Sequence, residues 1–181
     1  TMPTRPSKPV ESDPRLPRPI KAKPRPDVYV RSSVSHGKET RTGRSQLQGL
    51  WLSARSAELS RTVAPRMSWW LPPVIWPDEE ENLRRAIGRL WRDGARHFVC
   101  NAPWQRGLFP EQLDENADLL AGPFCNAANA SALGVLAGMG FSGAFVSPEL
   151  AQEDMLALPA QSPLPLGAVL SGYWPVGISR F

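Results

Sequence analysis

The clearest amphipathic pattern in the chain lies between residues 77 and 94. Four apolar residues recur there at the spacing of one helical face: Leu83, Ile87, Leu90 and Trp91. A proline and four acidic residues open the segment, where the free amides of a first helical turn favour negative charge. Gly94 is a typical end for a helix, and the residues after it have strand character. We therefore predict a helix that ends at Gly94 and a strand over 95–100.

Short apolar runs of strand length recur along the rest of the chain. We expect strands at 28–32, 49–53, 67–72, 95–100, 118–124, 141–146 and 166–170. Asn129 can cap a helix that Gly140 closes, and residues 147–149 have the pattern of the first turn of a further short helix that ends near Pro159. Strands that alternate with helices in this way predict an α/β fold with a parallel sheet.

The number of strands limits the architecture. Six or seven strands in about 155 residues are too few for a complete eight-stranded barrel, which typically takes about 250 residues. The sequence also ends at Phe181, directly after an apolar segment, with no closing helix. We therefore expect a partial or incomplete TIM-barrel-like parallel β/α fold in a fragment of a longer protein.

The first 26 residues differ from the rest in composition. They contain eight of the 20 prolines, and proline disfavours both helix and sheet because it fixes φ and lacks an amide donor. We predict that residues 1–26 are a Pro-rich basic linker and that residues 27–181 form the α/β domain. Such an arm can contact RNA or an acidic partner, or it can simply tether the domain to the rest of the parent polypeptide.

Charge and cysteine content indicate which partners and which cellular location the sequence favours. Residues 1–45 carry 11 Lys and Arg against 4 Asp and Glu, whereas residues 46–181 carry 10 Arg, no Lys and 13 acidic residues. The basic arm is consistent with RNA, but the acidic remainder is not. No apolar run of about 18 residues is found, so we expect no membrane contact. Two cysteines cannot make a disulfide framework, which favours a reduced, cytoplasmic location.

Standard catalytic and metal-binding motifs are not found in the sequence. It has no phosphate-binding P-loop, no dinucleotide fingerprint, no GxSxG and no HExxH. His36 and His97 lack the spacing of metal ligands, and Cys100 and Cys125 have no base nearby in the sequence. We therefore assign no catalytic residue and expect no metal site.

Polar residues at two consecutive strand ends are more informative. Asn126 and Asn129 follow one predicted strand, and Ser147 and Glu149 follow the next. The carboxyl ends of parallel strands share one edge, so we expect these four residues to share one rim that faces a ligand. The alternative is that Asn129 and Ser147 only cap helices while Glu149 complements a helix dipole.

The same segments resemble the peptidase U32 family. Residues 118–129 are similar to its strand-to-helix segment with the pattern Leu-Asn-x-x-Asn, and residues 140–150 are similar to its Ser-Pro-Glu-Leu segment. Residues 168–180 resemble a further strand of the family, and residues 70–74 with the acidic helix after them fit an upstream one. The resemblance covers roughly residues 46–181.

Some positions depart from the family pattern. Cys125 stands where leucine is usual, and Gly177 stands where methionine is common. The family's leading glutamate- and cysteine-containing signature is not found, and its iron–sulfur cysteines would follow Arg180. The resemblance therefore implies a later barrel-like segment or C-terminal copy. It implies no cofactor in this chain and an iron–sulfur cluster only as an option for the full-length protein.

The resemblance leaves two classes of function open. The family is described as collagenase-like, and it also includes proteins tied to hydroxylation of RNA or ubiquinone. No nucleophile–base pair is evident, so we favour an accessory or substrate-positioning domain that acts in cytoplasmic RNA modification or hydroxylation. The alternatives are a U32-type endopeptidase domain with a peptide substrate, and a plain interaction module. The substrate-binding candidates are Asn126, Asn129, Ser147, Glu149 and Gly172, and the isolated chain is expected to be inactive as a peptidase.

Overall fold

A computed structural model describes residues 29–31, 48–53, 56–58 and 63–170. In these residues seven parallel strands form one sheet in strictly sequential order. The strands are β1 (Tyr29–Arg31), β2 (Gln48–Trp51), β3 (Met67–Trp70), β4 (His97–Cys100), β5 (Asp118–Ala121), β6 (Gly143–Phe145) and β7 (Leu166–Gly167). The predicted α/β fold with a parallel sheet is confirmed. The predicted linker over 1–26 lies outside the described residues.

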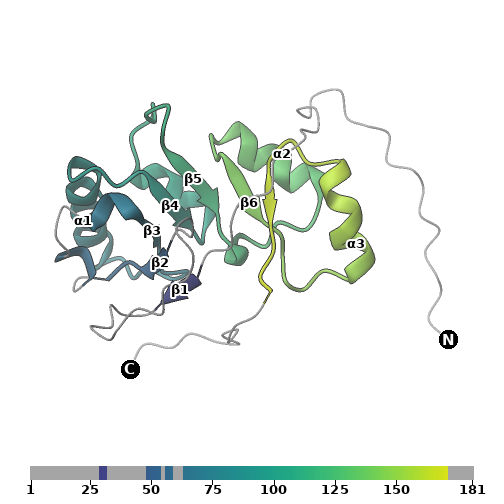
Figure 1. Cartoon of the computed structure of the whole chain (residues 1–181), viewed down its shortest axis with the longest axis horizontal. Helices are drawn as coiled ribbons and strands as arrows, with labels where there is room; N and C mark the ends of the chain where they lie inside the picture. The colour runs from purple at the N-terminus through teal and green to yellow at the C-terminus, as the bar shows by residue number, and fades with distance from the viewer. Residues whose placement is uncertain (1–28, 32–47, 54–55, 59–62, 171–181) are drawn as a thin grey trace.

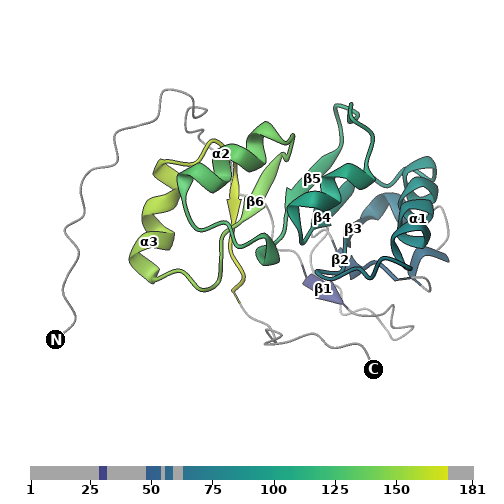
Figure 2. The same ribbon diagram turned by 180° about the vertical axis from the view of Figure 1, so that it is seen from behind.

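Helices and short 3-10 turns connect the strands. The α-helices are α1 (Glu80–Arg92), α2 (Ala130–Gly138) and α3 (Gln152–Ala157), and the 3-10 turns are η1 (Ser56–Glu58), η2 (Ala64–Arg66), η3 (Pro103–Leu108), η4 (Pro123–Cys125) and η5 (Leu158–Ala160). The helix α1 lies at one end of the molecule and α3 at the other, with strands between them (Figure 1). The view from behind shows the same arrangement (Figure 2). None of the helices in the described part of the chain combines the length and apolarity that crossing a bilayer requires.

Two of the three predicted helices are confirmed. After α1, Gly94 adopts a positive φ of 92°, the backbone conformation that made glycine a predicted stop. The Asn129 side chain caps α2 by accepting a hydrogen bond from the amide of Ala132 at 2.8 Å. Gly140, with φ of 88°, follows the end of α2.

The predicted start of the third helix is wrong. Ser147 does not begin a helix; its amide donates to the carbonyl of Ala127, beside the parallel bridge between Ala127 and Val146. Residues 148–150 form a turn, in which the amide of Leu150 bonds to the carbonyl of Ser147. The helix α3 begins only at Gln152, after Ala151.

One apolar core lies between the sheet and its helices. The strands supply a row of paired residues to it: Leu50, Trp69, Phe98 and Leu119. The helices α1 and α2 supply Ala86, Ile87, Leu90, Leu133 and Leu136 to the same cluster. Because α1 and α2 pack in one cluster with this row of strand residues, both helices cover the same face of the sheet. This arrangement agrees with the usual right hand of parallel crossovers in a sequential strand order.

The other face of the sheet is concave. It carries a second row of paired residues, Trp51, Trp70, Val99 and Leu120. The ring centroid of Trp70 lies 5.9 Å from that of Trp51 and 5.3 Å from that of Phe145 on β6. The strands β3 and β6 are three positions apart, which is about 14 Å in a flat sheet. Their rings meet because the sheet curves towards this side, which we call the concave face.

Candidate functional site

The two predicted polar segments lie side by side at the carboxyl ends of β5 and β6. Ala127 forms a parallel bridge with Val146, and the amide of Ser147 donates to the carbonyl of Ala127 at 3.0 Å. The structure thus brings the segment with Asn126 next to the segment with Glu149, at the edge where parallel α/β folds bind ligands. Gly172, the fifth candidate, lies outside the described residues.

The four candidate side chains have different local roles. Asn129 caps α2, and the buried hydroxyl of Ser147 accepts a hydrogen bond from the amide of Glu149 at 3.2 Å. Asn126 and Glu149 are exposed, and Asn126 adopts a left-handed backbone with φ of 52°, which asparagine tolerates better than most residues. Asn129 is also exposed, but its side chain caps α2, so Asn126 and Glu149 are the exposed candidates that do not act as caps.

Two buried side-chain amides after β4, those of Asn101 and of Gln105 in η3, were not predicted from the sequence. Asn101 follows β4 directly, and its Nδ2 donates to the carbonyl of Leu71 at 2.7 Å. The Oε1 of Gln105 accepts from the amide of Asn101 at 2.8 Å, while its Nε2 donates to the carbonyl of Pro72 at 2.7 Å. These bonds tie the segment after β4 to the segment after β3. A polar residue directly after a strand was the signal that could have identified Asn101.

Two buried polar atoms near this end have no hydrogen-bond partner among the described residues. They are the indole Nε1 of Trp70 and the side-chain Oδ1 of Asn101, on residues that are 5% and 1% exposed. Val99 is the register partner of Trp70, and Asn101 lies two residues after Val99 on the same face. The unpaired donor and the unpaired acceptor therefore belong to neighbouring strands and both belong to the concave face.

Gly122, at the end of β5, leaves room for the unpaired oxygen. A Cβ atom at this position would meet the Oδ1 of Asn101, and it would lie 2.8 Å from its Cγ and 2.9 Å from a methyl of Val99. Since the other half of the Asn101 amide is bonded to Leu71, the oxygen is held in place. The carboxyl end of β4 thus carries a fixed, neutral and unpaired acceptor.

The two cysteines are packed on the helix-covered side. The thiol of Cys125 donates to the carbonyl of Cys100 at 3.2 Å. Burial raises the pKa of Cys125 to about 11, although the backbone amide of Gly122 acts in the opposite direction. Burial also raises the pKa of Cys100, and the neighbouring Cys125 adds to this effect while Arg106 opposes it. Both thiols are therefore protonated at neutral pH, and neither is an activated nucleophile.

The iron–sulfur cluster that the resemblance allows for the full-length protein has no ligand set in the described residues. Across 29–31, 48–53, 56–58 and 63–170, no three His, Cys, Asp or Glu side chains converge. Such a cluster is usually held by four thiolates, and this chain offers two protonated, buried thiols. The residues present do not fit the cluster.

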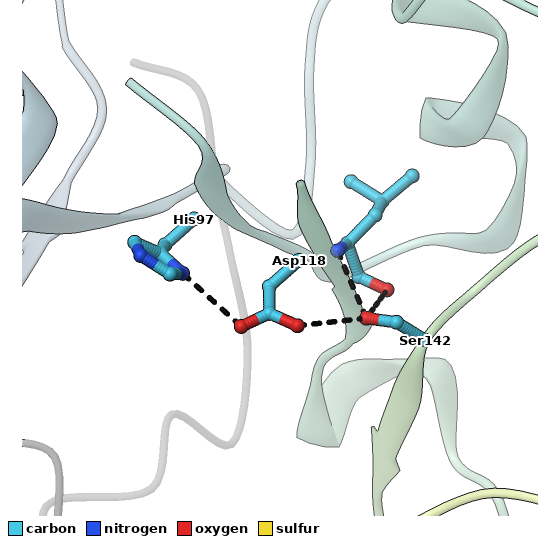
Figure 3. A network of polar contacts seen from close by, with 4 residues as sticks. His97, Asp118 and Ser142 are labelled. Atoms are coloured by element: carbon cyan, nitrogen blue, oxygen red, sulfur yellow. Dashed lines mark hydrogen bonds and ion pairs between the residues drawn. The ribbon is translucent and has the colours of Figure 1, made fainter. Parts of the chain in front are cut away.

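A second polar network lies at the amino ends of β4 and β5 (Figure 3). The carboxylate of Asp118 lies between His97 and Ser142, at 3.1 Å from the Nδ1 of His97 and 3.4 Å from the Ser142 hydroxyl. The same hydroxyl accepts from the amide of Leu119 at 3.1 Å. Ser142 contacts the carboxylate and not the imidazole, so the order of the groups is not that of a catalytic triad. We call these residues the amino-end network; it ties β4, β5 and the start of β6 together.

Comparison of the chain with protein-family models, with curated proteins and with solved structures finds no match in any of the three.

Proposed function

We propose that this chain is a substrate-positioning domain of a U32-type protein that acts in RNA modification or hydroxylation. In this proposal the substrate contacts the concave face at the carboxyl ends of β3 and β4, with Asn126 and Glu149 at the adjoining rim. The observation that carries the proposal is the pair of buried, unpartnered atoms, Trp70 Nε1 and Asn101 Oδ1.

The chemistry of this pair indicates what it would bind. Leaving a buried donor or acceptor without a partner costs about 1–3 kcal/mol, and native proteins rarely leave such groups unpaired without a reason. A substrate that offers an acceptor to Trp70 and a donor to Asn101 would recover both hydrogen bonds. A base edge has donors and acceptors side by side on a planar ring, and unstacked RNA bases are recognised in this way. The aromatic rings of Trp51, Trp70 and Phe145 suit a planar group.

The fold supports the same location. Sequential parallel strands with helices on one face and a concave opposite face are the features of an incomplete TIM-barrel-like sheet. In such folds ligands contact the carboxyl ends of the strands. The two segments that carry the U32 resemblance, 118–129 and 140–150, also end at this edge.

The geometry supports positioning better than peptide hydrolysis. The described cysteines are protonated by burial, and the Ser142 hydroxyl is bonded to Asp118 and Leu119 rather than to His97. Hydrolysis by a serine or thiol needs a nucleophile in contact with its base. The endopeptidase alternative therefore rests on the resemblance alone.

Two adjacent tryptophans provide the test. Trp70→Phe removes the unpartnered N–H and keeps an aromatic ring, whereas Trp69→Phe is the matched control on the opposite face of β3. We expect a fluorescein-labelled, twelve-nucleotide single-stranded RNA to bind the chain. Trp70→Phe should weaken this binding about tenfold, the effect of one lost hydrogen bond of about 1.4 kcal/mol. Trp69→Phe should leave the affinity of the folded protein unchanged.

The basic arm is a separate source of RNA affinity. Residues 1–45 would bind RNA through charge alone, and that component falls with salt and is insensitive to Trp70→Phe. If Trp70→Phe and the wild type bind RNA equally at every salt concentration, the concave face does not position RNA. Cleavage of gelatin by the chain would instead favour the endopeptidase alternative.

A further inference from the structure

A groove on the helix-covered side of the molecule is separate from the concave face. It has a volume of about 320 Å³ and lies between α1 and residues 108–110, at the end of the 3-10 turn η3. Gly88 and Trp91 of α1 form one side, and Phe109 and Pro110 form the other. The proposed function makes no use of this groove.

The groove is open because α1 has a glycine at its middle. Gly88 is exposed, and a Cβ atom built on it would meet nothing within 4 Å. Glycine is among the least favourable residues in a helix interior, since it loses more backbone freedom than any other residue. No contact within the described residues explains why position 88 is a glycine. A partner that approaches the helix backbone closely would explain it, because a side chain there would be in the way.

The surroundings of Gly88 are basic. Residues three and four positions away are its neighbours on a helix, and these are Arg84, Arg85, Trp91 and Arg92. Glu80 pairs with Arg84 at 3.2 Å and Glu81 pairs with Arg85 at 3.4 Å, both on the exposed surface. Arg92 makes no ion pair with any described residue. Of these arginines, Arg84 lines the groove and also donates to the carbonyl of Gly107 at 3.2 Å, whereas Arg85 and Arg92 flank Gly88 on the helix beside the groove.

We infer that the groove binds a short segment of a partner protein that carries an apolar side chain flanked by Asp or Glu. The apolar side chain would fill the space over Gly88 against Trp91 and Phe109. The carboxylates would pair with Arg92 and with Arg84 or Arg85, which hold their present glutamates only through exposed ion pairs.

Two observations favour a peptide over a nucleic acid at this site. The glutamates of the first turn offset two of the three arginines, so the local positive charge suits one or two carboxylates better than a chain of phosphates. Base stacking needs a free ring face. The Trp91 ring already stacks on Phe98, with centroids 6.0 Å apart, and Arg96 lies 4.7 Å over it.

The test selects peptides against the groove itself. A display library of random twelve-residue peptides is selected on the full chain, and binders that also bind Gly88→Trp, in which the groove is filled, are removed. We expect the remaining peptides to share an apolar residue with an excess of Asp and Glu around it. A set that has no acidic excess, or no peptide that distinguishes the two proteins, overturns the proposal.

Matched glycine variants then separate binding from stability. Gly88→Ala should raise the Tm by about 1–4 °C, because alanine favours the helix, and should weaken the selected synthetic peptide about tenfold. Gly138→Ala, in α2, is the control: its Cβ also meets nothing within 4 Å, and it should leave peptide affinity unchanged.

The charged part of the proposal has its own variant. Arg92→Gln should weaken peptide binding and reduce the salt dependence of that binding. Equal peptide affinity in Gly88→Ala and wild type, or a twelve-nucleotide RNA whose binding Gly88→Ala weakens, overturns the assignment.

Discussion

At the amino ends of β4 and β5, one carboxylate holds two other side chains. Asp118 lies 3.1 Å from the Nδ1 of His97 and accepts from the hydroxyl of Ser142, and each of these groups is only partly buried. At the other end of the sheet, Trp70 and Asn101 are almost fully buried and each keeps one polar atom without a partner. The charged carboxylate thus lies at the end of the sheet that is partly open to water, and the two neutral unpaired atoms lie at the end that is buried.

In the proposed function, the two ends of the sheet divide cohesion from recognition. The amino-end network uses its polar atoms to hold neighbouring strands together. At the carboxyl end that task belongs to Gln105 and to the Nδ2 of Asn101, which bond the segments after β3 and β4. The remaining donor and acceptor have no partner among the described residues, and the proposed function assigns them to the substrate. Four changes test this difference, in order of decreasing effect.

The largest effect is expected from Gly122→Ala at the carboxyl end. The new methyl would meet Oδ1 of Asn101 and would lie 2.9 Å from a methyl of Val99, while the bond to Leu71 prevents the amide from moving away. Overpacking of this kind should lower the free energy of unfolding by about 3 kcal/mol, measured by urea denaturation. Gly138→Ala, which has open space around its Cβ, should change it by less than about 0.5 kcal/mol. A cost below about 1 kcal/mol for Gly122→Ala would mean that Asn101 is not held in place.

A second effect is expected in alkaline solution, again at the carboxyl end. The pKa of Cys125 rises from 9.0 to about 11 on burial, so between these values the unfolded chain releases a proton that the folded chain keeps. The stabilisation is complete below pH 8 and is lost as the pH rises through 9 towards 11, by roughly 2 kcal/mol for this thiol. Urea denaturation at pH 8 and pH 10.5 measures it. Cys125→Ala should show a smaller fall than wild type, and identical falls would contradict the burial of the thiol.

The amino-end network should respond more weakly. Asp118→Asn keeps the shape of the side chain but removes the charge that His97 and Ser142 share. Because the pair is partly exposed to water, we expect a loss of roughly 1 kcal/mol in the free energy of unfolding at pH 6. The affinity for the RNA probe should not change, since the network lies at the opposite end of the strands. Weaker RNA binding by this variant would contradict the proposal that only the carboxyl end of the sheet contacts the substrate.

Local patterns were sufficient to predict most of the fold. The apolar spacing of α1 and the glycine after it are properties of neighbouring residues, and both were confirmed. The predicted start of α3 was wrong because the chain first makes a single turn, closed by the amide of Leu150 on the carbonyl of Ser147, and the helix begins only at Gln152. Serine and proline favour a turn as well as the first turn of a helix, so their pattern does not distinguish the two. The curvature of the sheet was likewise invisible until Trp70 and Phe145 were seen in contact.

The candidate site could be predicted only at its rim. Asn126 and Glu149 follow strands in the sequence, and that position alone predicts the carboxyl edge of a parallel sheet. The unpaired atoms of Trp70 and Asn101 were not predictable, because pairing depends on what three or more strands place around them. Trp69 and Trp70 are adjacent and chemically identical, yet only the structure shows that one N–H has a partner and the other has none.

The smallest effect is expected from Trp70→Phe, and the same change at the adjacent Trp69 is its comparison. The indole N–H of Trp69 donates to the carbonyl of Ala64 at 3.0 Å, whereas that of Trp70 has no partner. Trp69→Phe therefore removes a hydrogen bond that is satisfied in the folded protein and leaves a small cavity. The Ala64 carbonyl still accepts from the amide of Met67, so the cost should be about 1–2 kcal/mol. Trp70→Phe also leaves a small cavity, which is destabilising, but it removes a buried donor that was already unsatisfied, which is stabilising. Because these two contributions offset each other, the net loss in the free energy of unfolding should stay near 0.5 kcal/mol. Urea denaturation of both variants measures the difference, with circular dichroism to confirm that both are folded. Equal costs would mean that the Trp70 N–H is already satisfied in solution, and the contrast between the two ends of the sheet would then fail at its central residue.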